Sequence, residues 1–253
     1  MTRDEALAQY RPIRAAIQRV LAQAPKVCTA ADWQRAARAL GFGTADSIEV
    51  GSEREIEMLG DVALFEPNQR GKRAYDRFLK TQADQLEPED RDVAQRMADA
   101  FFSIFEVSSR HDIAGVWLKD LLIDSEPIWL MDESMEASAP DGIMVGMRLF
   151  DAGSFYAGFG IVVPVDAELV QLTRMSPAAP GQRPFGRRLV PMVYGDEIYK
   201  AEVVTLVEEM LGSGPLPDLS DPLDLLGVPD EERSRRPAAG RRPRKHSKSR
   251  RGG

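Results

Sequence analysis

The sequence of 253 residues contains one cysteine, Cys28, and two histidines, His111 and His246. A single cysteine excludes an intramolecular disulfide framework and a cysteine-rich zinc site. The start, MTRDEALAQY, carries scattered charge in place of the apolar core of a secretory signal. No apolar run approaches the ~18 residues that suggest a membrane span. We therefore expect a cytoplasmic protein that holds no cofactor or metal and does not bind a membrane.

The glycine motifs of nucleotide-binding proteins are also missing. GFG occurs at 41–43 and again at 158–160, and neither copy fits the GxGxxG or the P-loop pattern. The composition, with 43% hydrophobic and 29% charged residues, is that of an ordinary globular protein with a sizeable core. These absences favour an interaction protein over an enzyme.

Charge is divided sharply along the chain. Residues 233–253 hold ten Lys and Arg and no Asp or Glu. The remaining 23 basic residues stand against 40 acidic ones in 1–232, which gives that part a formal charge of about −17. The sequence therefore indicates an acidic body with a basic C-terminal end.

Residues 1–101 are predicted to be helical. Apolar residues recur at steps of three and four over 4–21, which indicates a helix with one buried face. Thr29 with Asp32, and Ser52 with Glu55, have the spacing of capping boxes and predict two helix starts. Two further helices are expected at about 70–83 and after Pro88.

The apolar period changes after residue 101. Short runs broken by turn residues predict strands across 102–165, which we expect to form a small antiparallel β-barrel-like domain. Glycines within the runs suit the sharp bends of such a sheet. The five expected strands are 103–108, 114–123, 127–132, 142–150 and 154–165.

A helical extension with a Pro/Gly linker is predicted over 166–212. It comprises a helix at 166–174, the linker MSPAAPGQRPFGRR and a last helix at 196–211. Residues 213–253 have the composition of a largely disordered segment, basic from 233 onward. The expected fold class is α+β, with a helical N-terminal region, a five-stranded antiparallel barrel-like sheet, a C-terminal helix and a disordered basic tail.

Several stretches in this order resemble a group of uncharacterised bacterial proteins. They are DWQRAARALGF, IEMLGDVALFE and FFSIFEVSSRHDIAGVWLKDLLIDSEPIWLMDES, followed by GMRLF. The resemblance spans roughly residues 30–165 and implies a bacterial origin. Some proteins of that kind end in a cysteine-rich zinc tail, the SEC-C motif. This chain departs from them because residues 233–253 contain no cysteine.

Carboxylates near the second and third predicted strands could form a magnesium site. Asp120, Asp124, Asp132 and Glu133 supply the oxygen ligands that Mg²⁺ prefers. A Mg²⁺-dependent hydrolase is therefore the alternative function. Asp124 also suits the turn DSEP for bend geometry alone, and Asp120 and Glu133 are expected to point at water.

Two isolated groups are weighed as catalytic candidates. His111 lies in the predicted turn SRHD, and histidine titrates near neutral pH. A catalytic histidine needs a nucleophile and an orienting carboxylate, and Asp112, its neighbour in sequence, is expected to diverge from it in space, so we expect a surface turn residue. Cys28 precedes a helix start, which lowers a thiol pKa, yet it lacks a nearby histidine. A structural role is expected for Cys28.

The basic tail provides the predicted binding residues. Lys and Arg at this density attract phosphates, and the absence of aromatic residues in 233–253 excludes base stacking. We expect non-specific electrostatic attachment to RNA, DNA or ribonucleoprotein. The residues expected to carry it are Arg241, Arg242, Arg244, Lys245, Lys248, Arg250 and Arg251.

The predicted function is thus that of a non-enzymatic accessory protein of the bacterial cytoplasm, whose compact part docks an unidentified protein partner or pairs with a second copy of itself. A second possibility for the tail is an intramolecular contact with the acidic body, which would make the tail autoinhibitory. An anionic protein surface is a third. The sequence leaves these alternatives open.

Overall fold

The computed structural model describes residues 1–43, 50–176 and 183–212, with side chains up to residue 205. In the described part of the first hundred residues the regular elements are helical, as the sequence predicts, although α4 starts after the predicted residue 70. They are α1 (Arg3–Gln23), α2 (Ala30–Leu40), α3 (Glu53–Phe65), α4 (Ala74–Gln82) and α5 (Pro88–Met97), with 3-10 turns η1 (Ala24–Val27) and η2 (Ala83–Gln85).

Both predicted capping boxes are present. Thr29 and Asp32 bond reciprocally at the start of α2, and Ser52 and Glu55 do the same for α3. In each case the N-cap side chain accepts from the N3 amide while the N3 carboxylate accepts from the N-cap amide. Gly41 ends α2 with φ of 84°, a conformation that glycine adopts without a Cβ penalty.

All five predicted strands are present; β1 is longer than predicted and the other four are shorter. They are β1 (Phe101–Arg110), β2 (Val116–Asp120), β3 (Ile128–Leu130), β4 (Met144–Asp151) and β5 (Tyr156–Pro164). A short helix that the sequence analysis did not predict, α6 (Glu133–Ser138), separates β3 from β4.

The strands pair in the order β1-β2-β3-β5-β4, and β4 returns to β1, so the sheet closes on itself. The expectation of a fully antiparallel sheet is wrong, because β3 and β5 run parallel where Leu130 pairs with Tyr156. The reason is geometric. Neighbours in an antiparallel ring must alternate in direction, and five strands cannot alternate all the way round. One parallel pair is the smallest departure that closes the ring.

The chain after the strands forms α7 (Ala167–Met175), the 3-10 turn η3 (Gly186–Arg188) and α8 (Leu189–Gly212). Helix α8 begins before the predicted residue 196. The chain divides into two compact units, Met1–Val203 and Val204–Gly253. The predicted disordered tail, 213–253, lies outside the described residues. Of the helices within the described part, none has both the length and the apolar character needed to cross a membrane.

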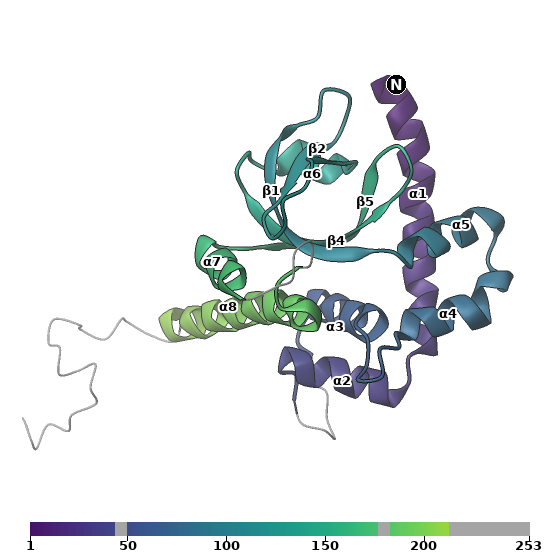
Figure 1. The fold of residues 1–253 in the computed structure, drawn as a ribbon. Helices are drawn as coiled ribbons and strands as arrows, with labels where there is room; N and C mark the ends of the chain where they lie inside the picture. Colours follow the sequence, from purple (N-terminus) through teal and green to yellow (C-terminus); the bar gives the residue numbers. More distant parts are fainter. Residues whose placement is uncertain (44–49, 177–182, 213–253) are drawn as a thin grey trace, which may run out of the picture. The chain divides into compact units, whose positions relative to one another are not determined.

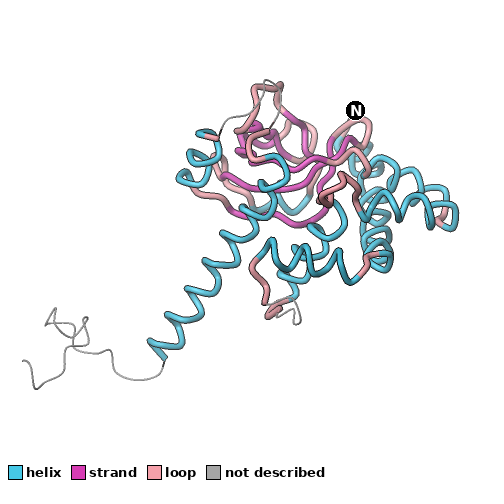
Figure 2. The backbone as a smooth tube through the Cα atoms, turned by 60° about the horizontal axis from the view of Figure 1, so that its bottom comes forward, coloured by secondary structure: helices cyan, strands magenta, loops and turns pink. Residues whose placement is uncertain are grey.

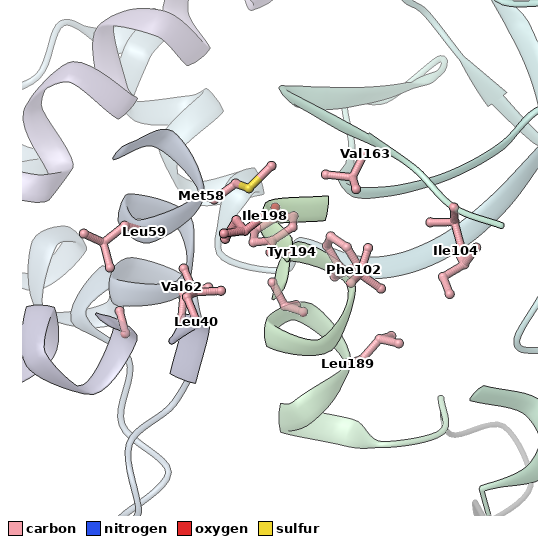
Figure 3. Close-up of a cluster of buried hydrophobic side chains, with 14 of the residues drawn as sticks. Leu40, Met58, Leu59, Val62, Phe102, Ile104, Val163, Leu189, Tyr194 and Ile198 are labelled. Atoms are coloured by element: carbon pink, nitrogen blue, oxygen red, sulfur yellow. The ribbon is translucent and has the colours of Figure 1, made fainter. Parts of the chain in front are cut away.

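Within the first unit, helices pack beside the strands. In Figure 1, α1, α4 and α5 lie together at one side of the strands, and α2 and α3 lie below β4; Figure 2 shows the same separation of cyan helices from magenta strands. A core cluster joins α3, α8 and the sheet, as Figure 3 shows. Its labelled members include Met58, Val62, Phe102, Ile104, Tyr194 and Ile198. Helix α8 thus completes the core over β1 and α3.

Candidate functional site

The seven residues predicted to bind nucleic acid lie outside the described part of the chain. They are Arg241, Arg242, Arg244, Lys245, Lys248, Arg250 and Arg251. Their role in binding remains a prediction.

The structure buries Asp120 instead of pointing it at water. Its side chain accepts hydrogen bonds from Ser103 Oγ at 2.7 Å and from the Leu122 amide at 2.9 Å, and Arg183 Nη2 pairs with it at 2.7 Å. The sequence analysis expected Asp120 to lie within a longer strand and to point outward by the alternation of side chains. Strand β2 instead ends at Asp120, where the chain turns. Asp120 therefore fastens the end of β2 and has its oxygens occupied.

The other carboxylates of the proposed magnesium group are engaged separately. Asp132 caps α6 by accepting from the Ser134 and Met135 amides at 2.9 Å, and Glu133 pairs with Arg11 of α1 at 2.9 Å. Asp124 is exposed. Across the ranges that the structure describes, no three His, Cys, Asp or Glu side chains gather closely enough to hold a metal ion. The four carboxylates are not brought together.

His111 is half-buried and not a freely exposed turn residue. Its ring stacks on Trp129 with centroids 4.0 Å apart and planes 6° apart, and it also contacts Trp117 at 4.6 Å. The sequence analysis missed this because the two tryptophans face each other across β2 and β3. Burial lowers the pKa of His111, with Asp112 opposing that shift, and Nδ1 accepts from the Ile113 amide at 3.0 Å. Packing accounts for these contacts.

Cys28 is half-buried at the end of η1, where it contacts residues of two core clusters. Burial raises the pKa of its thiol to about 11, and the nearby Asp32 carboxylate adds to the rise. A thiol with so high a pKa is protonated at neutral pH and is a poor nucleophile. This environment agrees with the structural role expected for Cys28.

A pocket of about 420 Å³ opens between α1, α2, α3 and β5. We call it the Arg14 pocket. Helix α3 contributes a stripe at four-residue steps, Ile56, Gly60 and Leu64, which the helical repeat places on one face. Trp33 of α2 and Phe159 of β5 also line it. Its volume falls within the ~300–1,000 Å³ typical of small-molecule sites, and its wall is largely apolar.

Polar groups of the Arg14 pocket come from two helices. Arg14 and Gln18 belong to α1, and Glu57 and Asp61 belong to α3. The guanidinium of Arg14 lies against β5 at Gly160, and Nη1 donates to the Gly158 carbonyl at 3.5 Å, the limit of a hydrogen bond. The cation of this pocket is therefore weakly held by the protein.

Asp61 links the pocket to a buried ionic group that we call the Arg148 cluster, formed by Asp61, Glu66, Arg148 and Tyr194. Arg148 Nε and Nη2 pair with the two oxygens of Asp61 at 2.8 and 3.0 Å, and Nη2 also reaches Glu66 at 3.0 Å. The Tyr194 hydroxyl donates to Asp61 at 3.2 Å. The oxygens of Asp61 are therefore fully engaged.

The Arg148 cluster keeps its guanidinium charged. Burial alone would lower the pKa of Arg148, but the attraction and hydrogen bonds of Asp61, followed by Glu66, outweigh it and raise that pKa. Burial raises the pKa of Glu66, although the charge and hydrogen bond of Arg148 lower it in part. Burial also raises the pKa of Tyr194, and the Asp61 charge adds to it. The cluster is a buried ionic link between β4 and the end of α3, joined to α8 by the hydrogen bond of Tyr194.

A second hollow, of about 600 Å³, lies between α1 and the start of α5. Its Arg19 and Asp90 bond to each other, with Nη2–Oδ1 at 2.6 Å and Nε–Oδ2 at 2.9 Å. Its lining is about half polar, whereas that of the Arg14 pocket is mostly apolar. The Arg14 pocket is therefore the better candidate for a binding site.

The sequence analysis did not find this pocket, because its walls come from helices and a strand far apart in the chain. One signal was available for the cluster beneath it. Arg148 stands within the apolar run GIMVGMRLF, and Asp61 stands within IEMLGDVALF. An ionisable residue inside an apolar run is usually paired when it is buried. Two such residues of opposite charge are therefore candidates for a buried ion pair.

A family model described as "Family of unknown function (DUF7986)" matches residues 4–170. This range includes every residue named in the lining of the Arg14 pocket, and it excludes α8. No curated protein and no solved structure matches the chain.

Proposed function

Because the chain belongs to the DUF7986 family, whose function is unknown, we propose a function from its own residues. The protein is a non-enzymatic accessory protein of the bacterial cytoplasm. Its compact unit binds a partner molecule in the Arg14 pocket, and its basic end attaches to nucleic acid.

The Arg14 pocket is the observation that carries the binding role. It is concave and apolar, with a few polar groups at its edge, as binding sites commonly are. Catalysis would favour ionisable groups with a free hydrogen-bonding position, whereas Asp61 beneath the pocket is occupied by Arg148 and Tyr194. These features favour binding over catalysis.

The alternative hydrolase draws no support from the carboxylates on which it depends. Asp120 is bound by Ser103 and Arg183, while Asp132 caps α6. Replacing Asp120 and Asp132 with Asn tests it directly. Bound Mg²⁺ or Mn²⁺ in the purified protein, lost in that double variant, would favour the hydrolase over the binding protein.

The charge of the C-terminal end supports the second part of the proposal. Residues 233–253 carry ten basic and no acidic residues, while the rest of the chain has a formal charge of about −17. An acidic body disfavours a polyanion, so attachment to phosphate falls to the basic end. Without aromatic residues there, binding depends on backbone charge and not on base sequence.

The test compares the full chain with a version ending at Glu232, using a fluorescent RNA and a DNA duplex at several salt concentrations. We expect only the full chain to bind. If six tail charges engage duplex DNA, the log–log salt slope is about −5, from ~0.9 per phosphate. A full-length control with Gln at the seven named positions should bind much more weakly than the natural full chain.

If neither version binds at low salt, the nucleic-acid part of the proposal is wrong. If the truncation instead binds a partner of the compact unit more tightly than the full chain does, the tail is autoinhibitory. That second outcome would leave the binding role of the Arg14 pocket intact.

A further inference from the structure

We infer that the Arg14 pocket binds a small amphipathic carboxylate, whose apolar body lies within the pocket and whose carboxylate pairs with the Arg14 guanidinium. This inference rests on the proposed function, because it names the ligand class for the same site. The arguments come from the pocket wall, from Gly60, from Arg14 and from the charges nearby.

The wall of the pocket suits an apolar body. Leu64 and Phe65 of α3 and Phe159 of β5 are buried, while Ile56 is 57% exposed. Ile56 therefore exposes apolar surface beside a concave apolar wall. Covering that surface with a ligand removes it from water and lowers the free energy. The apolar part of the ligand is therefore expected between Ile56 and Phe159.

Gly60 leaves space on the α3 side of the pocket. A Cβ built on Gly60 meets no atom within 4 Å, apart from the backbone of its own helix. Glycine in a helix interior destabilises it by about 1 kcal/mol relative to alanine, so helix formation does not explain this residue. An open wall for a bound molecule is consistent with it.

Arg14 supplies the charge at the edge of the pocket. A Cβ at Gly160, whose φ is 103°, would lie 2.9 Å from Nη2 of Arg14, so the guanidinium occupies the space that a side chain would fill. Among the described residues Arg14 forms no ion pair, and its bond to the Gly158 carbonyl is 3.5 Å long. A guanidinium has five N–H donors in a planar fork that matches a carboxylate.

The surrounding charges set the orientation of the ligand. Asp61 already accepts from Arg148 and Tyr194, so it does not attract a second cation strongly. Glu57 is exposed on the same wall and opposes an anion. The carboxylate is therefore expected on the Arg14 side, and removing the charge of Glu57 should strengthen binding.

The experiment compares three probes with one apolar body: octanoate, octan-1-ol and octylammonium, each titrated into the full chain. Because the protein has three tryptophans, its ¹H–¹⁵N spectrum has one indole signal for each of them, and Trp33→Phe identifies the one from the pocket. We expect octanoate to shift the Trp33 signal and to leave those of Trp117 and Trp129 unchanged. Octanoate should bind about tenfold more tightly than octanol, the gain from a charge-assisted hydrogen bond.

Three variants and one matched control locate the binding. Gly60→Leu should fill the pocket and abolish octanoate binding, whereas the matched control Gly60→Ala should retain it. Arg14→Gln should reduce octanoate affinity to that of octanol, while Glu57→Gln should raise it. Thermal unfolding of each variant checks that it folds, and Arg14→Gln provides the test if Gly60→Leu does not.

The inference is overturned if octylammonium binds more tightly than octanoate, or if Arg14→Gln leaves octanoate affinity unchanged. It is also overturned if no probe shifts the Trp33 signal. In that last case a larger partner could still occupy the pocket, and Gly60→Leu would then weaken partner binding without any effect on octyl probes. Nucleic-acid attachment is measured with the tail truncation and is independent of these outcomes.

Discussion

Arg148 is a buried cation that is stabilised by two carboxylates, Asp61 and Glu66. Its side chain is 5% exposed and lies over Phe65, with its guanidinium carbon 5.0 Å from the ring centroid. Replacement by Met would leave Asp61 and Glu66 close together without their counter-ion. Breaking a buried pair in this way costs about 3–5 kcal/mol.

We expect Arg148→Met to lower the free energy of unfolding by about that 3–5 kcal/mol, measured by urea denaturation. The control is Arg96→Met, which removes an exposed pair with Asp92 and should cost less than about 1 kcal/mol. Equal stability of the two variants would show that the Arg148 cluster does not hold the fold together.

Asp32 makes stability depend on pH. Burial pushes its pKa upward, but hydrogen bonds from the Thr29 amide and hydroxyl and from Arg77 outweigh this and lower the pKa to about 2. A depressed carboxyl pKa contributes stability above the unfolded-state value, near ~4, and this contribution is lost as pH falls toward 2.

Asp32→Asn should therefore destabilise the protein by about 2 kcal/mol at pH 7, from ~1.36 kcal/mol per pKa unit. The difference between the variant and the natural chain should shrink once the pH falls below about 4. Urea midpoints at a series of pH values measure this. A difference that stays constant down to pH 3 would mean that the charge of Asp32 is not the source.

Two glycines show how differently one residue type serves two elements. Gly60 has open space around a built Cβ, so Gly60→Ala should stabilise α3 by about 1 kcal/mol. Gly115, with φ of 78°, precedes β2, and its Cβ would lie 2.1 Å from the Leu130 carbonyl oxygen. Gly115→Ala must displace β3 and should destabilise the protein. Thermal unfolding of both variants tests the pair, and a shift of the same sign in both would contradict it.

Local signals allowed most elements to be predicted from the sequence. The capping boxes at Thr29 and Ser52 depend on residues three positions apart, and the structure contains both. Helix α6 was missed because its six residues directly follow a predicted strand and carry no apolar repeat. The early start of α8 was missed because Gly186 and Pro191 are residue types that are common in linkers. Proline is nevertheless tolerated in the first turn of a helix.

Long-range pairings could not be read from the sequence. The parallel contact of β3 with β5 depends on how the ring closes, and the Arg148–Asp61 pair spans 87 positions. The Arg14 pocket combines α1, α2, α3 and β5, so no single segment reveals it. The tail residues were proposed from charge alone, and they lie outside the described part of the chain.

At the scale of the whole molecule, the core extends beyond the family match. The match ends at residue 170, but Leu189, Val193 and Tyr194 of α8 belong to the same cluster as Phe102 of β1. Tyr194 also donates to Asp61. The first compact unit ends at Val203.

A chain ending at 203 should therefore unfold cooperatively near the midpoint of the full chain. A chain ending at 170 should expose Phe102, lose much of its stability and aggregate. Circular dichroism during heating, with size-exclusion chromatography, compares the two. Similar stability of the shorter chain would mean that α7 and α8 contribute little to the core.

The parallel contact that closes the ring has a further consequence for dynamics. Leu130 and Tyr156 form a single paired position, supported by the bond from the Met131 amide to the Tyr156 carbonyl at 2.9 Å, whereas β1 and β4 pair over six positions. Sub-global opening begins where few hydrogen bonds must break. Parting β3 from β5 would turn the ring into an open sheet with two unpaired edges, which can template intermolecular strand pairing. Deuterium uptake at Met131 should therefore precede uptake in β1, and it would report this opening while the remaining strands stay paired.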